Sequence, residues 1–275
     1  MSIEQKPQIK GIIWMMIHCL TISFAIALVK LLSDRGFGSV QIIFFYSLIS
    51  FCVSVPSVFK KDGYAILKLS NLKKVKIYLI KSGFGFLAII LYFIALKTIP
   101  MTDMRAIALF SPVCTFIFAI FFLSEKLSSQ KIIVLLTSLV GGYIIINPAS
   151  VTFHKASILV ILAVICWSIV DIIIKKISFK EDEYITKQIF FSQFFILIYA
   201  LIYSGFFSFE GWVMPDSFTS IFLIFTTGFS FFMSSFSIRM AAKNADLTTI
   251  MPFDFSGMIF TIAISYILFD EVIKQ

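Results

Sequence analysis

The fold class is decided by residues 107–148, which read IALFSPVCTFIFAIFFLSEKLSSQKIIVLLTSLVGGYIIINP. Two apolar runs, 107–123 and 131–148, are separated only by the polar break SEKLSSQ at 124–130. A helix needs about 20 predominantly apolar residues, with a range of roughly 17 to 25, to cross the hydrocarbon core of a bilayer. Each run reaches that length, so the segment predicts two membrane-spanning helices joined by a tight turn.

The composition of the whole chain agrees with this interpretation. Of its 275 residues, 59% are hydrophobic and 14% are charged, and phenylalanine alone occurs 34 times. Soluble globular proteins average roughly 45–50% apolar and about 25% charged residues. The same values exclude a disordered chain, a collagen-like fibre and a disulfide-rich secreted scaffold. The four cysteines lie inside apolar stretches, and we interpret them as small buried hydrophobic side chains.

Nine stretches of the chain are long and apolar enough to span a membrane. They cover residues 11–31, 38–58, 77–97, 104–123, 131–148, 157–176, 185–205, 217–238 and 249–269. The connections between them are short and leave no room for a soluble domain. The sequence therefore predicts an all-α polytopic membrane protein whose surroundings are the lipid bilayer.

Basic side chains predict the orientation, because the cytoplasmic loops of membrane proteins are enriched in lysine and arginine. With a cytoplasmic N-terminus, sixteen basic residues including Arg239 fall on the cytoplasmic side, and six including Arg105 fall on the opposite side. Lys81, inside the third stretch, is expected to snorkel to the cytoplasmic surface. The bias also explains the net charge of +8, so no nucleic-acid partner is predicted.

An internal repeat becomes visible when the chain is shifted against itself by 146 residues. Lys30 then falls on Lys176, and Glu125 falls on Glu271. The same shift brings the starts of four pairs of apolar stretches into rough register, which is stronger evidence than the few identities. The chain is therefore predicted to consist of two related halves.

We interpret residues 1–150 as a first repeat of five transmembrane helices and residues 151–275 as a second repeat with four. Because five is an odd number, the second repeat enters the membrane inverted. Inverted repeats are typical of secondary transporters, whose substrate site lies near the bilayer midplane between the halves. The partner of the fifth stretch would begin near residue 276, so the chain is expected to carry nine helices of ten.

Residues 107–148 resemble the end of the first EamA-type repeat in the drug/metabolite transporter superfamily: a proline-bearing helix, an acid followed by a basic residue, and a glycine-rich fifth helix. The segments LAVICWSIVDIIIKKI (162–177) and ADLTTIMPFDFSGMIFTIAISYILFDE (245–271) are similar to the first and fourth helices of the second repeat. The ending Lys175–Lys176 after Asp171 is similar to bacterial S-adenosylmethionine uptake transporters. The resemblance implies a bacterial inner-membrane location and a small-molecule substrate.

Two acids inside apolar stretches are the leading candidates for substrate binding or proton coupling. Asp171 is costly to place in hydrocarbon and must face protein or water. Lys175 follows one helical turn later and is expected to neutralise it if the pair has only a structural role. Asp254 lies between Pro252 and Gly257, a combination that suits a kinked helix lining a substrate path. The alternative for Asp254 is an interfacial acid that reaches water.

Five uncharged or weakly basic side chains complete the predicted site. His18 lies in the middle of the first stretch, where a histidine relays protons or bonds a neighbouring helix. Trp14 and Trp167 are candidate aromatic walls for planar or cationic ligands, with lipid or packing contacts as the alternative. Tyr46 in the second stretch and Gln193 in the seventh are weaker candidates.

Several functions are not supported by any motif in the sequence. No glycine-rich phosphate-binding loop, catalytic constellation or metal-ligand spacing occurs, so no ATP drive, enzymatic activity, cofactor or metal is predicted. We expect a secondary transporter of a small polar metabolite, with S-adenosylmethionine uptake as the specific hypothesis. Two alternatives stay open: an efflux carrier for amino acids or drugs, and a truncated membrane protein that does not transport. A homodimer also stays open.

Overall fold

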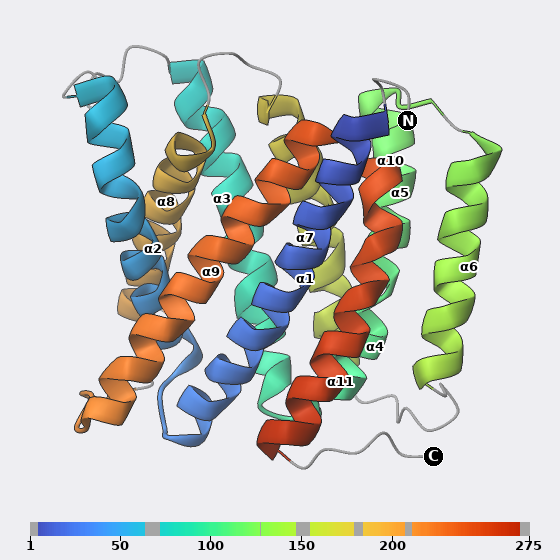
Figure 1. Ribbon diagram of the computed structural model, residues 1–275. Helices are drawn as coiled ribbons and strands as arrows, with labels where there is room; N and C mark the ends of the chain where they lie inside the picture. Colours follow the sequence, from blue (N-terminus) through green and yellow to red (C-terminus); the bar gives the residue numbers. More distant parts are fainter. Residues whose placement is uncertain are drawn as a thin grey trace.

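The computed structural model describes residues 5–63, 72–126, 128–146, 155–178, 184–206 and 211–269, and every regular element within these ranges is helical. The helices form one bundle whose long axes run mostly up and down in the view of Figure 1. In chain order they are α1 (Gln5–Asp34), α2 (Ser39–Asp62), α3 (Leu72–Leu96), α4 (Met101–Ala108), α5 (Phe110–Leu123), α6 (Ser129–Ile146), α7 (Ser157–Ser178), α8 (Ile185–Phe206), α9 (Phe218–Asn244), α10 (Leu247–Ile250), the 3₁₀ helix η3 (Met251–Phe255) and α11 (Ser256–Phe269).

The predicted all-α membrane fold is confirmed. Within the described ranges, eight helical segments are long and apolar enough to cross a membrane, and the remaining predicted stretch is the apolar helix α6. Helix α6 stands at one edge of the bundle in Figure 1, where Leu135 packs with Phe255 and Met258. Hydropathy and length alone therefore located the helices.

Two predicted helices are interrupted, and each interruption has a proline nearby. The stretch 104–123 divides into α4 and α5 at Leu109, and Pro112 just beyond cannot bond to the carbonyl four residues earlier. The last stretch divides into α10, η3 and α11, with Pro252 at the start of η3. Under the shift of 146 residues, Leu109 corresponds to Phe255, the last residue of η3. Both halves thus break their fourth helix at the same place.

Helix contacts follow a pattern that is preserved when the halves are exchanged. Helix α1 packs against α9 and α11, and correspondingly α7 packs against α3 and α5. Helix α2 packs against α8 and α9, and α8 packs against α2 and α3. Figure 1 shows α1 descending and α7 ascending through the bundle. The predicted pair of inverted repeats requires this pattern, although the boundaries at residues 150 and 151 stay a prediction.

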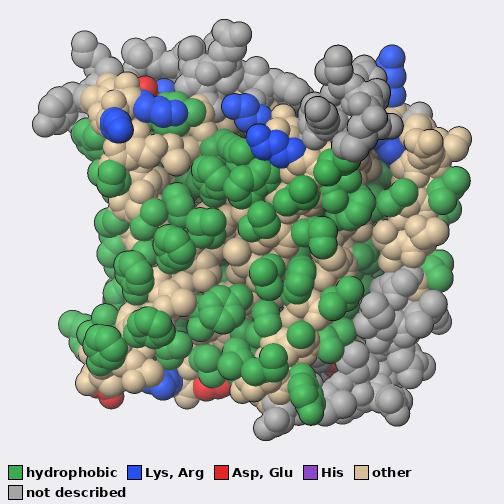
Figure 2. Space-filling view, viewed as in Figure 1, with side chains coloured by type: hydrophobic (Ala, Val, Ile, Leu, Met, Phe, Trp, Pro, Cys, Tyr) green, Lys and Arg blue, Asp and Glu red, His purple; other side chains and the backbone are tan. Residues whose placement is uncertain are grey.

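Close packing in the interior contrasts with an apolar outer surface. At Gly228, a Cβ atom would lie 2.5 Å from Ile49 Cβ, so glycine is what lets α9 approach α2. Figure 2 shows hydrophobic side chains across the height of the molecule, with lysine and arginine side chains gathered along the edge where α1 begins. This arrangement suits a bundle surrounded by lipid, with its charged residues at the water-facing ends.

The predicted burial of the cysteines needs correction, and two predicted features lie outside the described residues. The four cysteines are free, as expected, but Cys52 is exposed and Cys114 is only partly buried. Glu271, the predicted counterpart of Glu125, lies outside the described residues, as does 64–71 of the lysine-rich connection.

Candidate functional site

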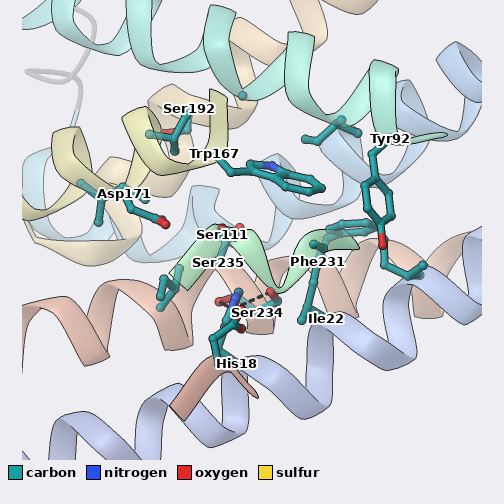
Figure 3. A pocket seen from close by; sticks show the side chains of 18 of the residues that line it. His18, Ile22, Tyr92, Ser111, Trp167, Asp171, Ser192, Phe231, Ser234 and Ser235 are labelled. Atoms are coloured by element: carbon teal, nitrogen blue, oxygen red, sulfur yellow. Dashed lines mark hydrogen bonds between the residues drawn. The ribbon is translucent and has the colours of Figure 1, made fainter. Parts of the chain in front are cut away.

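A cavity of about 220 Å³ occupies the middle of the bundle. Its wall is built from central turns of α1, α3, α7, α8 and α9, and is completed by α2, α4, α5, η3 and α11. Figure 3 shows the side chains of its polar and aromatic residues pointing toward one another from several helices. Both predicted halves therefore contribute to one site at mid-bundle depth.

An ion pair between Arg105 and Asp254 forms one part of the wall. Arg105 Nη2 donates to Asp254 Oδ1 at 3.1 Å and to the Asp254 carbonyl oxygen at 2.8 Å. Cys19 Sγ donates to the same carboxylate oxygen at 3.4 Å. Gly257 makes room for the guanidinium, because a Cβ atom there would lie 2.2 Å from Arg105 Nη2. The break in each fourth helix thus brings a charge from each half into contact.

Asp171 lies on α7 and accepts a hydrogen bond from Thr115 Oγ1 of α5 at 3.4 Å. Lys175, one turn further, does not neutralise it as expected in the structural alternative. Its ammonium donates instead to the carbonyl oxygens of Ala242 and Ala245, at 2.7 Å and 2.5 Å. Those carbonyls lie at the end of α9, where the helix leaves acceptors without intrahelical partners. Asp171 therefore faces the cavity without Lys175 as its partner.

Two basic side chains contact Ser192. Figure 3 shows Ser192 at the same end of the cavity as Asp171. Lys81 Nζ of α3 donates to Ser192 Oγ. Arg239 of α9 reaches the same hydroxyl through Nη2 at 3.4 Å, and its Nη1 donates to the Ser235 carbonyl oxygen at 2.7 Å. Lys81 and Arg239 are each only 4% exposed. We refer to Lys81, Ser192 and Arg239 as the basic cluster.

Aromatic rings form the other end of the cavity. Trp167 of α7 and Tyr92 of α3 lie with their ring centroids 5.0 Å apart. Tyr46 of α2 stacks on Phe231 of α9 with their ring centroids 4.1 Å apart. Figure 3 shows Trp167 projecting into the space between Asp171 and Tyr92. The site thus offers planar apolar surface next to a charged end.

His18 bonds a neighbouring helix. Its Nδ1 lies 2.9 Å from Ser234 Oγ and 3.0 Å from the Ser234 carbonyl oxygen, both on α9. The side chain also lines the cavity. Trp14, one turn before it, packs edge-on against Phe236 with ring centroids 5.7 Å apart and forms no part of the wall.

The comparisons with known proteins agree with this architecture. Residues 9–147, about half of the chain, match the model of the EamA-like transporter family. The chain belongs to this family. The match covers the segment that we interpret as the first repeat, while residues 151–275 stay a predicted second one.

The relatives of this EamA-like transporter are named after different substrates. An S-adenosylmethionine uptake transporter of Rickettsia felis is 24% identical over 266 residues, covering 97% of this chain and 86% of the relative. A riboflavin transporter of Vibrio cholerae is 23% identical, covering 99% and 89%. A pseudopaline exporter of Pseudomonas aeruginosa is 22% identical, covering 95% and 88%. The predicted family resemblance is confirmed, and the names indicate membrane transport.

A solved crystal structure of a protein has the same fold as this EamA-like transporter. It matches with a TM-score of 0.74 at 14% sequence identity, covering 96% of this chain and 88% of the other. At that identity the likeness concerns the fold alone.

The structure brings six of the seven predicted site residues into the cavity wall. These are His18, Tyr46, Trp167, Asp171, Gln193 and Asp254, while Trp14 lies outside it. Their roles in this EamA-like transporter stay predictions. The expectation that Asp254 is an interfacial acid does not fit its burial and its pairing with Arg105.

Three basic residues of the wall were misassigned from sequence. Lys81 was expected to snorkel to the surface, yet it is buried beside Ser192. Arg105 and Arg239 were counted as residues of opposite water-facing segments, yet both line the cavity. The signal was present for Arg105, which lies inside the apolar stretch 104–123. Removing both arginines from the orientation count lowers each side by one and leaves the bias unchanged.

Proposed function

We propose that this chain is a secondary transporter of a small metabolite that carries a zwitterionic amino-acid group and a flat ring, with S-adenosylmethionine as the first candidate. The observation that carries the proposal is the cavity at mid-bundle, which has aromatic rings at one end and side chains of both charge signs at the other. The ring of such a metabolite would pack against the aromatic end of the cavity, and its ammonium and carboxylate groups would pair with the charged side chains at the other end.

The proposed transport mechanism is alternating access between two inverted repeats, 1–150 and 151–275. Contacts between helices keep their pattern when the halves are exchanged, so two arrangements of similar stability are available to the same set of interfaces. The broken fourth helices supply hinges beside the cavity, since a break leaves backbone groups without intrahelical partners. Each arrangement would expose the cavity to one side of the membrane.

The proposed orientation has a cytoplasmic N-terminus in a bacterial inner membrane. It is supported by the basic side chains along the edge of the bundle where α1 begins (Figure 2). A periplasmic reporter such as alkaline phosphatase should be active when fused after Gly211 and inactive when fused after Gly63. The reverse pair of activities would contradict the orientation and would leave the proposed substrate class unaffected.

The proposed function is tested by transport in proteoliposomes containing the purified chain. We expect labelled S-adenosylmethionine to accumulate by counterflow when unlabelled S-adenosylmethionine is trapped inside. Asp254→Asn should abolish counterflow, because it removes the charge that holds Arg105 in the wall. Cys52→Ser, at an exposed position away from the cavity, is the matched control and should keep it.

Absence of counterflow in the wild-type chain would refute S-adenosylmethionine as the cargo. Riboflavin is the second ligand to test in the same vesicles, because the aromatic wall offers planar surface for any flat ring. Measurements in right-side-out and inverted vesicles then separate uptake from the efflux alternative.

A further inference from the structure

The basic cluster has more hydrogen-bond donors than acceptors. A lysine ammonium carries three donors and an arginine guanidinium carries five, and neither accepts. Ser192 Oγ receives donors from both Lys81 and Arg239, and it donates its own proton to the Gln188 carbonyl oxygen. The hydroxyl is therefore saturated. Within the described part of the chain, Arg239 Nε has no acceptor.

The basic cluster also lacks a neutralising partner in direct contact. Among the described residues, neither Lys81 nor Arg239 has a carboxylate within ion-pair distance. Arginine keeps its charge in proteins, and a buried charge inside a membrane is expensive unless an opposite charge compensates it. Such residues usually mark a substrate or ion pathway. An anion entering the cavity would meet unused donors at a point where the described residues place no carboxylate in direct contact with the two basic groups.

We propose that Lys81, Arg239 and Ser192 form a carboxylate-binding subsite inside the cavity. A carboxylate matches the planar fork of a guanidinium and accepts two parallel hydrogen bonds from it. The proposal rests on the proposed function, because it names the group of a zwitterionic substrate that binds at this end. It also adds basic residues to the charged candidates from the sequence, which were Asp171 and Asp254.

The position of Asp171 extends the subsite to a complete zwitterion. Figure 3 shows Asp171 on α7 and Ser192 on α8 at the same end of the cavity, with Trp167 between this end and Tyr92. The carboxylate of an α-amino acid moiety would bind the basic cluster, and its ammonium group would bind Asp171. The remainder of the substrate would then extend toward the aromatic rings.

An alternative is that Asp171 acts as the permanent counter-ion of Arg239 across the cavity, with no ligand anion involved. The two arrangements differ in ligand preference. A subsite predicts that ligands bind better with a carboxylate than without it. A permanent counter-ion predicts no such preference.

The experiment compares pairs of ligands that differ only in the carboxylate, using the full chain in nanodiscs and isothermal titration calorimetry. One pair is S-adenosylmethionine and decarboxylated S-adenosylmethionine; the second is methionine and 3-(methylthio)propylamine. In the wild-type chain, we expect the carboxylate-bearing member to bind roughly 10- to 100-fold more tightly, as charge-assisted hydrogen bonds imply.

The variants Arg239→Gln and Lys81→Met should each reduce that preference by tenfold or more, toward equal binding of the two members. Arg35→Gln is the matched control, because Arg35 contacts Ser220 outside the cavity and the same change there should leave the preference intact. Size-exclusion profiles check that each variant is folded, and Lys81→Met tests the subsite independently if Arg239→Gln fails to fold.

Equal or weaker binding of the carboxylate-bearing members by the wild-type chain, or binding of neither, would overturn the subsite. An unchanged preference in both variants would overturn it as well. Failure of the proposed function is distinguishable from these results. If S-adenosylmethionine is not transported but a carboxylate preference depends on Arg239, the cargo is wrong and the subsite is supported.

Discussion

The contact between Gly257 and Arg105 predicts an unusual effect of a single methyl group. In Gly257→Ala, the new Cβ atom would lie 2.2 Å from Nη2, 3.0 Å from Cζ and 3.3 Å from Nε of Arg105. Ordinary van der Waals contact begins near 3.4 Å, so Nη2 must retreat by about 1.2 Å. That displacement takes it away from Asp254 Oδ1, now at 3.1 Å, and from the Asp254 carbonyl oxygen at 2.8 Å.

The expected cost follows from the bonds that are lost. Hydrogen bonds to charged groups each contribute roughly 1.5–3 kcal/mol, and an alanine in place of glycine recovers up to about 1 kcal/mol of helix propensity. The side chain of Arg105 is flexible and keeps part of its attraction to Asp254. We therefore expect Gly257→Ala to lower the free energy of unfolding by roughly 1–3 kcal/mol.

The assay is unfolding by sodium dodecyl sulfate in mixed micelles, followed by tryptophan fluorescence. Gly205→Ala in α8 is the matched control, because no atom lies within 4 Å of the Cβ position there. Transport per inserted molecule should fall in Gly257→Ala and stay near the wild-type level in the control.

The decisive measurement is whether the effect of Gly257→Ala on the free energy of unfolding changes sign when Arg105 and Asp254 are replaced. With Arg105→Ala and Asp254→Asn already in place, the guanidinium is gone and no buried charge is stranded. Gly257→Ala should then be neutral or should stabilise by up to about 1 kcal/mol through helix propensity. If the alanine costs as much in this background as in the wild-type chain, the reasoning from the guanidinium is refuted.

Three further predictions concern contacts elsewhere in the bundle. Glu125→Ala should lower the free energy of unfolding by about 0.5–2 kcal/mol, because its carboxylate accepts two backbone N–H bonds at the start of α10; Glu125→Gln should cost less, and equal losses would contradict this capping role. Asp171→Asn should abolish transport while the protein is still inserted, whereas Lys175→Ala should reduce transport less. Near-normal transport per inserted molecule by Asp171→Asn would show that this carboxylate does not bind a charged substrate or a proton. Trp167→Ala should weaken ligand binding roughly tenfold by calorimetry, and Trp14→Ala should leave it unchanged; equal effects would remove Trp167 from the site.

Most of the fold could be predicted from the sequence, because the requirement for a membrane-spanning helix is local. An apolar stretch of sufficient length satisfies its own backbone, so hydropathy locates it without tertiary information. Pro252 and Gly257 predicted a kink in the last stretch, and η3 lies there, whereas the stretch 104–123 was interpreted as one continuous helix although Pro112 lies near its break.

The candidate site was harder to predict, because a basic residue near a helix end has two options that hydropathy cannot separate. Lys81 can extend its ammonium to water or bury it beside a polar partner. In the structure it is buried, because Ser192, more than a hundred residues away in the sequence, accepts a hydrogen bond from it. Arg239 was expected just beyond the end of an apolar stretch that stops at residue 238, whereas α9 continues to Asn244. Trp14 packs against Phe236 outside the wall although its neighbour Met15 lines the cavity, a difference of helix face that hydropathy does not resolve in an apolar helix.

The two halves share a scaffold but not a set of charges. Under the shift of 146 residues, Asp171 corresponds to Ala25, Asp254 to Ala108, and Arg239 to Phe93. Exchange of helix contacts needs only the apolar scaffold to be symmetric, because it is the packing interfaces that must re-form in each arrangement. A substrate with one aromatic end and one charged end has no such symmetry. If the proposed function holds, we expect these asymmetric positions to be where the cavity distinguishes the ends of its ligand, since selection for exchange alone would favour similar residues in both halves.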